Sequence, residues 1–247
     1  MPLYAGATLL SVSTFAHVII GVRDVQRIRA EELAIQREKL AVLNRLVRHN
    51  LRHEAQYLLG VESEVERADT PESRAELSER VRTIANRLSE THDTLNRSQE
   101  IIKGGDRSTT PIDVHHAVED VVREYRATYP DATIAVDVPT EYRVSAGREF
   151  RTVLEELIEN AIVYADGVPD VQVSATKSGR RIKPEVTDNG PGIPEPDRSV
   201  IAREVEIDQM THAQGLGLWF VRWAMDAYDG EFGLDTDGNG TTVTLEI

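Results

Sequence analysis

Two glycine pairs are the feature that most constrains this chain. The first follows a carboxylate in Asp188-Asn189-Gly190-Pro191-Gly192, and the second lies in Ala213-Gln214-Gly215-Leu216-Gly217-Leu218. Because glycine has no Cβ, a loop of this kind can pass close to a flat ligand. The second pair leads into a predicted helix start, and the exposed N–H groups of a helix N-terminus are a natural phosphate site. Together the two segments predict a nucleotide pocket.

An acidic residue and an amide lie upstream on one predicted helix. In Glu156-Leu157-Ile158-Glu159-Asn160-Ala161 the side chains of Glu156 and Asn160 are four residues apart and therefore share a face. Either glycine pair alone is an ordinary turn signal. Three such segments in this order are far more specific than any one of them.

The three segments resemble the N, G1 and G2 boxes of the GHKL ATP-binding fold found in sensor histidine kinases, over residues 110–247. The resemblance implies ATP and Mg²⁺ as cofactors. It implies that Asp188 accepts a hydrogen bond from the adenine amino group, and that Asn160 is the metal ligand through its carbonyl oxygen, the ligand type that Mg²⁺ prefers. It leaves Glu156 as either a metal ligand through water or a general base. The nucleotide-binding residues implied are Asn160, Asp188, Gly190, Gly192, Gln214, Gly215, Leu216 and Gly217.

The amino-acid composition excludes some classes of binding partner and some kinds of reactive or metal site. The 247 residues can hold one or two domains with real cores. Acidic residues exceed basic residues by 42 to 28, so the formal charge is −14 and nucleic acid is not expected as a partner. Without cysteine, disulfides, thiolate metal sites and a cysteine nucleophile are excluded.

Residues 3–22 carry no formally charged side chain and are followed closely by Arg23, Arg27 and Arg29. Their number matches the roughly 20 residues of a membrane-spanning helix. We therefore expect residues 1–22 to form a transmembrane helix in the cell membrane, and the arginines place residues 23–247 in the cytoplasm by the positive-inside rule. Polar residues within the segment keep a helix buried in a dimer as the alternative.

Residues 23–103 predict a helical hairpin. Leu33, Leu40 and Val47 recur every seven residues with Leu43 between, which is a coiled-coil repeat. Thr70 and Pro71 fit the N-cap and the first position of a second helix, whose predicted seam is Leu77, Val81, Ile84, Leu88, Thr91, Leu95, Ser98 and Ile102. A lone hairpin has little core, so we expect a homodimer with a four-helix bundle.

The first hairpin helix carries His49-Asn50-Leu51-Arg52 and, one turn later, His53. The heptad register places His49 on the outer side of the seam. The segment resembles the phosphoacceptor box of histidine kinases, in the form common in kinases of salt-loving archaea, which implies His49 as the phosphorylated residue. Two histidines at this spacing also suit a metal, but no third protein ligand is evident.

Residues 104–111 predict a flexible linker, and residues 112–247 a catalytic ATP-binding domain. We expect helices over 114–129 and 147–164, strands over 133–138, 142–145, 171–175, 181–186, 232–235 and 241–247, and a lid over 194–212. The predicted fold class is α+β: a helical hairpin followed by a GHKL-type α/β sandwich with a mixed sheet and helices on one face.

The resemblance implies a two-component sensor histidine kinase that phosphorylates His49 with ATP and passes the phosphoryl group to an aspartate of a response regulator. Two alternatives stay open. A GHKL ATPase would use Glu156 to activate water and would turn ATP over without phosphohistidine. A dimeric scaffold would only bind nucleotide, and any autophosphorylation would exclude it.

Overall fold

The structure, a computed structural model, describes residues 2–65, 70–103, 109–194, 198, 201 and 216–247. Residues 1–42 and residues 43–247 form two compact units. Helix α1 spans Pro2–Val65 and helix α2 spans Pro71–Ile102. The Thr70 side chain accepts a hydrogen bond from the Ser73 backbone N–H, and Pro71 begins α2, so the predicted helix start is confirmed.

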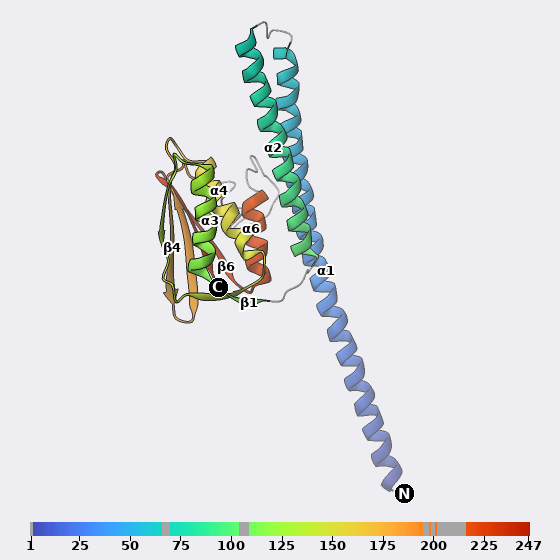
Figure 1. Ribbon diagram of the computed structural model, residues 1–247. Helices are drawn as coiled ribbons and strands as arrows, with labels where there is room; N and C mark the ends of the chain where they lie inside the picture. The colour runs from blue at the N-terminus through green and yellow to red at the C-terminus, as the bar shows by residue number, and fades with distance from the viewer. Residues whose placement is uncertain (1, 66–69, 104–108, 195–197, 199–200, 202–215) are drawn as a thin grey trace. The chain divides into compact units, whose positions relative to one another are not determined.

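The described parts of α1 and α2 in the second unit form the expected helical hairpin (Figure 1). Its buried apolar side chains come from both helices and include Leu43, Leu46 and Ile84. The predicted repeat is buried only in part in the single chain, because Leu33 is 54% exposed whereas Leu43 is 1% exposed. Val42 and Leu46 are buried beside Leu43.

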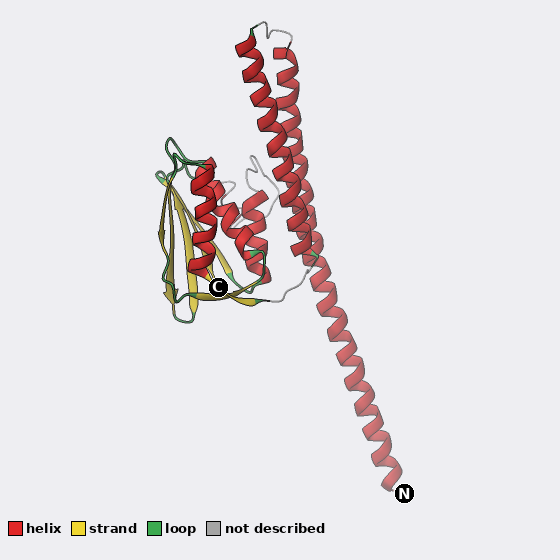
Figure 2. Cartoon of the chain, in the orientation of Figure 1, coloured by secondary structure: helices red, strands yellow, loops and turns green. Residues whose placement is uncertain are grey.

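The remaining elements are strands and helices, and two strands follow each described helix among them (Figure 2). They are β1 (Thr110–Asp113), α3 (Val114–Thr128), β2 (Thr133–Asp137), β3 (Arg143–Ala146), α4 (Phe150–Val163), β4 (Asp170–Ser178), β5 (Arg181–Asp188), α6 (Leu216–Ala227), β6 (Glu231–Asp237) and β7 (Gly240–Glu246). Strand β1 is an addition to the predicted elements. Its pairing with β3 is antiparallel and forms a separate small sheet.

The larger sheet has the strand order β2-β4-β5-β7-β6. Strand β2 runs parallel to β4, and every other neighbouring pair is antiparallel, so the predicted mixed sheet is confirmed. Helices α3, α4 and α6 lie on one face (Figure 1). The chain's last strand, β7, therefore lies between β5 and β6, well inside the sheet.

Helix α4 orients the site because its two faces differ. Its buried face includes Phe150, Leu154 and Leu157, which repeat at three- and four-residue intervals and pack into the core. Helix α6 is apolar around most of its circumference, as expected for a helix enclosed by protein. With α4 held this way, Glu156 and Asn160 are placed on its other side.

One prediction from the N-terminal sequence is not supported. No helix in the described part of the chain is long and apolar enough to cross a membrane, although residues 3–22 were expected to do so. The physical reason lies in the sequence, since Thr8, Ser11, Ser13, Thr14 and His17 lower the mean hydropathy of that segment.

Candidate nucleotide-binding site

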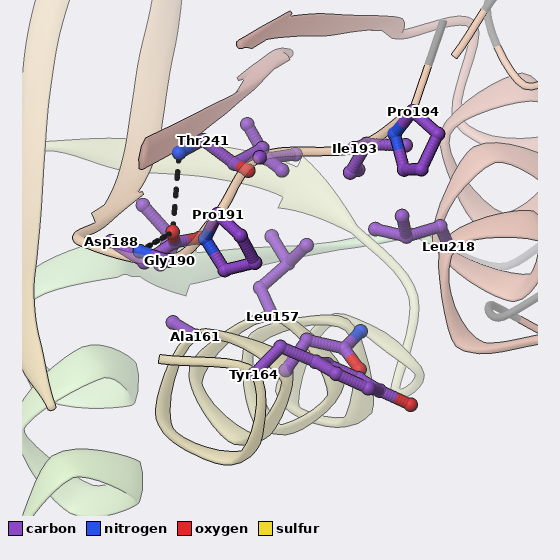
Figure 3. A pocket seen from close by; sticks show the side chains of 14 residues that line it. Leu157, Ala161, Tyr164, Asp188, Gly190, Pro191, Ile193, Pro194, Leu218 and Thr241 are labelled. Atoms are coloured by element: carbon purple, nitrogen blue, oxygen red, sulfur yellow. Dashed lines mark hydrogen bonds between the residues drawn. The ribbon is translucent and has the colours of Figure 1, made fainter. Parts of the chain in front are cut away.

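A cavity of about 350 Å³ lies between the end of β5, helix α4 and the start of α6 (Figure 3). Its volume falls within the range typical of small-molecule sites. Its lining is mostly apolar, with few polar side chains. The lining residues are Leu157, Asn160, Ala161, Tyr164, Val186, Asp188, Gly190, Pro191, Gly192, Ile193, Pro194, Leu218, Thr241 and Val243.

Asp188 is fixed at the inner wall of this cavity by two backbone groups. Its Oδ1 atom accepts hydrogen bonds from the N–H of Gly190, at 2.8 Å, and from the N–H of Thr241, at 3.1 Å (Figure 3). Both of these bonds use the same oxygen. The carboxylate is thereby held in one orientation, with Oδ2 as a second acceptor for a ligand donor such as an amino group.

The glycines around Asp188 allow close approach of chain segments. A Cβ on Gly190 would lie 2.9 Å from both the Asp188 Oδ1 atom and the Tyr164 carbonyl oxygen. Gly192 has a φ of +80°, a conformation that glycine adopts without strain. Gly240 packs directly against the backbone carbonyl of Asp188. These glycines leave room for neighbouring chain segments, and their expected role toward a nucleotide ring stays a prediction.

Asn160 reaches the cavity from the outer side of α4. Its Nδ2 atom is buried and has no hydrogen-bond partner among the described residues. An unpaired buried amide costs free energy unless a ligand satisfies it. A polar ligand at this end of the cavity would satisfy the amide. The carbonyl oxygen of Asn160 is also the ligand type that Mg²⁺ prefers.

Glu156 lies one turn before Asn160, and its side chain is only 15% exposed. Its Oε1 atom is 3.3 Å from the Thr94 hydroxyl oxygen and 3.7 Å from Nη1 of Arg97. Burial raises the pKa of the Glu156 carboxyl to about 7, and the Glu159 carboxylate adds to the rise. The Arg97 guanidinium and the Thr94 hydroxyl counteract part of this rise. Glu156 can therefore exchange a proton near neutral pH.

The start of α6 meets these two side chains. Leu216 begins the helix, and Gly217 faces α4 so closely that a Cβ there would overlap the Glu156 Oε2 atom and lie 3.4 Å from Asn160 Nδ2. The structure thus brings Glu156, Asn160, Asp188, the first glycine pair, Leu216 and Gly217 together. Gln214, Gly215 and most of the predicted lid lie outside the described residues.

The two histidines of α1 differ in exposure in the opposite sense to the one predicted. His49 is half-buried, with Nδ1 buried and unpaired within the described residues, whereas His53 is exposed. Their rings stack with centroids 6.1 Å apart, and the His53 ring meets the edge of Tyr57 at 4.8 Å. His49 is not among the described residues that line the cavity.

Several site residues were missed by the sequence reasoning. Thr241 binds Asp188 through its backbone, and Tyr164 lines the cavity just after α4. Thr94 and Arg97 reach Glu156 from α2. Thr241 directly follows Gly238-Asn239-Gly240, between the predicted strands 232–235 and 241–247, but that position does not indicate a bond to Asp188.

Comparison with known proteins agrees with this site. Residues 146–247 match the family model described as histidine kinase-, DNA gyrase B-, and HSP90-like ATPase. The sensor-like histidine kinase SenX3 of Mycolicibacterium smegmatis is 29% identical over 191 residues, which are 73% of this chain and 50% of that protein. SenX3 of Mycobacterium tuberculosis strain H37Rv is 30% identical over 73% of this chain and 46% of its own length. The chain spans about half the length of these curated relatives.

Solved structures share the fold. Histidine kinase ThkA, in complex with the response regulator protein TrrA, aligns with a TM-score of 0.65 and 19% identity over 89% of this chain and 65% of that chain. Histidine kinase AdeS of Acinetobacter baumannii aligns with a TM-score of 0.57 and 22% identity over 81% of this chain and 96% of that chain. Residues 146–247 therefore match the ATPase family model, and the chain is similar in sequence to sensor-like histidine kinases.

Proposed function

We propose that this chain is an ATP-dependent protein-histidine kinase of a two-component system. In this proposal, ATP phosphorylates His49, and the phosphoryl group then passes to an aspartate of a response regulator. The observation that carries the proposal is the arrangement of Asp188 and Asn160 at one cavity, with a fixed carboxylate on one wall and an unsatisfied amide on another.

Asp188 would bind and orient the nucleotide base. Its Oδ1 atom is already engaged by two backbone N–H groups, so the remaining oxygen is directed rather than free to rotate. The base would be enclosed by the apolar side chains of Leu157, Val186 and Ile193. The glycines add no side chains to this wall. An adenine ring combines a flat apolar surface with an exocyclic amino donor, and both properties match this wall.

Asn160 would hold a Mg²⁺ ion between the protein and the phosphates. When bound, Mg²⁺ would neutralise part of the phosphate charge during transfer. Gly217 at the first turn of α6 leaves room beside Asn160, and backbone N–H groups at a helix start favour anions. A protein of similar fold, ShkA, is known as a full-length crystal structure in complex with AMPPNP.

His49 would be the nucleophile, because it lies in the His49-Asn50-Leu51-Arg52 segment on the hairpin helix. A homodimer would complete the hairpin as a four-helix bundle. Exposed apolar side chains on the hairpin, including Leu51, Leu58 and Leu59, support that assembly, because such side chains are costly to leave in water.

Hydrolysis of ATP by water is the second candidate, and the raised pKa of Glu156 favours it. A carboxyl that titrates near pH 7 suits a general base that accepts a proton from water. This reaction would release phosphate and leave no phosphoprotein.

Labelling with γ-phosphate-labelled ATP distinguishes the candidates. We expect the purified protein with Mg²⁺ to acquire a label that acid removes and base leaves intact, as phosphohistidine does. Phosphate release without any protein-bound label would favour hydrolysis. Nucleotide binding without label or phosphate release would favour a binding scaffold.

A further inference from the structure

Thr236 is a polar residue on an otherwise apolar side of β6. Side chains alternate along a strand, so Phe232, Leu234 and Thr236 share the face that the helices cover. Thr236 pairs with Thr241 of β7 across the sheet, and Thr241 lines the cavity. Thr236 itself is not among the residues that line the cavity, so a direct contact with a ligand does not explain its presence.

The Thr236 hydroxyl joins two separate segments. It accepts a hydrogen bond from the backbone N–H of Ile193 at 3.1 Å, and it donates one to the carbonyl oxygen of Gly240 at 3.0 Å. Ile193 belongs to the cavity wall after β5, and Gly240 begins β7. One side chain therefore fastens the far end of the wall to the β6–β7 hairpin.

Gly192 shows how tightly this end of the wall is seated. A Cβ at Gly192 would overlap the Thr236 hydroxyl and lie 3.1 Å from the carbonyl oxygen of Asp237. The other end of the wall is held by the bond from the Thr241 N–H to Asp188. The stretch between Asp188 and Ile193 is thus attached to the same hairpin at both ends.

We propose that Thr236 is a positioning residue of the nucleotide site, which acts through Ile193 and Gly192 to hold the base-binding wall in its bound shape before nucleotide arrives. The inference rests on the proposed function, because it assumes that the cavity binds ATP. A wall that is already ordered saves the conformational entropy that binding would otherwise cost. Loss of the Thr236 hydroxyl should therefore weaken nucleotide binding without removing any group that touches the nucleotide.

The alternative is that Thr236 only stabilises the β6–β7 turn through Gly240. Thr242 of the same hairpin offers a matched control, because its hydroxyl also shares a hydrogen bond, with the Thr187 hydroxyl of β5 at 3.0 Å. Thr242 is not among the described cavity-lining residues, although its neighbours Thr241 and Val243 are. A purely structural role predicts the same behaviour for Thr236→Val and Thr242→Val.

The test compares wild type, Thr236→Val, Thr236→Ser and Thr242→Val by calorimetric titration with a non-hydrolysable ATP analogue and Mg²⁺. Valine keeps the shape and strand preference of threonine, and serine keeps the hydroxyl. We expect Thr236→Val to raise the Kd about tenfold, the effect of one lost hydrogen bond to a wall that must then be ordered on binding. Thr236→Ser and Thr242→Val should stay within about twofold of wild type.

Amide hydrogen exchange gives a second measurement on the nucleotide-free wild type and needs no variant to fold. We expect the Ile193 N–H to be protected, and Thr236→Val to remove that protection while leaving that of Val243 unchanged. Wild-type affinity in Thr236→Val, an equal loss in Thr242→Val, or an unprotected Ile193 in the wild type would overturn the inference. If the wild type binds no nucleotide, the proposed function itself is overturned, and the positioning role with it.

Discussion

The carboxylate of Glu156 on α4 lies against the backbone of Gly217 in the first turn of α6, at the position that a Cβ of residue 217 would occupy. The same glycine is close to the Asn160 amide. Because residue 217 has no side chain, the carboxylate of Glu156 and the amide of Asn160 can lie close to the start of α6.

Replacing Gly217 with alanine should separate stability from activity. Alanine favours helix over glycine by up to about 1 kcal/mol, and the clashing atom is the end of a flexible side chain, so the melting temperature should stay the same or rise slightly. Phosphoprotein formation should fall at least about tenfold, because Glu156 is displaced. Thermal unfolding and labelling with γ-phosphate-labelled ATP measure the two effects. In a Glu156→Ala background, Gly217→Ala should cost much less activity, and equal losses in both backgrounds would contradict this explanation.

Replacing Asp188 with asparagine should weaken ATP binding far more than it weakens the fold. The asparagine carbonyl oxygen can still accept the bonds from the N–H groups of Gly190 and Thr241, but the second acceptor becomes a donor. Loss of a hydrogen bond to a charged acceptor predicts an increase in Kd of about ten- to a hundredfold. Calorimetric titration checks this, with Asp235→Asn on the exposed side of β6 as the control. Unchanged affinity would mean that the nucleotide site lies elsewhere.

Replacing Asn160 with alanine should abolish Mg²⁺-dependent labelling while the protein remains folded. The side-chain nitrogen has no partner within the described residues, so its removal breaks no internal hydrogen bond. The thermal midpoint should stay the same or increase, because a buried unsatisfied group is lost. The exposed Asn239→Ala serves as the control for labelling. Labelling at the wild-type level in Asn160→Ala would exclude this residue as the metal ligand.

The pKa of Glu156 predicts a pH-dependent effect of Glu156→Gln on stability. Burial raises the pKa from 4.5 to about 7, so folding favours the protonated form. The wild type therefore loses stability as the pH rises from about 4.5 to about 7, and glutamine, which stays neutral, does not. Above pH 7 the variant should be more stable by about 3 kcal/mol, and the difference should vanish below pH 4.5.

Chemical denaturation of the nucleotide-free protein at pH 4, 6 and 8 measures this difference. The exposed Glu141→Gln should show no such trend. A difference between Glu156→Gln and wild type that is constant over this range would mean that Glu156 has an ordinary pKa.

Replacing His49 with glutamine should eliminate the acid-labile label, while His53→Gln should leave it largely intact. The proposed phosphoacceptor segment begins at His49, and adjacent helix residues point about 100° apart, so Glu54 is poorly placed to activate His53. Mass spectrometry under alkaline conditions locates the phosphate directly. Phosphate on His53 would reverse the assignment, which is a sharp test because His53 is the more exposed histidine.

The parts of the site that the sequence predicted are those set by short-range geometry. Glu156 and Asn160 share a face because helical spacing requires it, and Asp188 lies at the end of β5 because alternation along the strand predicts it. Thr241 and Thr236 were missed because their roles depend on cross-strand register between segments some fifty residues apart in the chain. No local pattern encodes that register.

The prediction that His49 lies on the outer, accessible side of α1 was wrong for a different reason. The repeat of Leu33, Leu40, Leu43 and Val47 identifies the apolar side of α1, and Leu43 is buried as that repeat predicts. His49 lies off that side and is still half-buried. Periodicity identifies the apolar side of a helix, but the elements that pack on the helix decide which other residues they cover.

The position of β7 bears on the order of events during synthesis. The wall at Asp188 is closed by Thr241 of β7, and β7 separates β5 from β6 in the sheet. A ribosome-bound chain that has emerged only as far as β6 has all three helices of the domain but lacks the strand that joins the sheet. Under the proposed function, we therefore expect nucleotide to stabilise the nascent domain only after β7 has inserted.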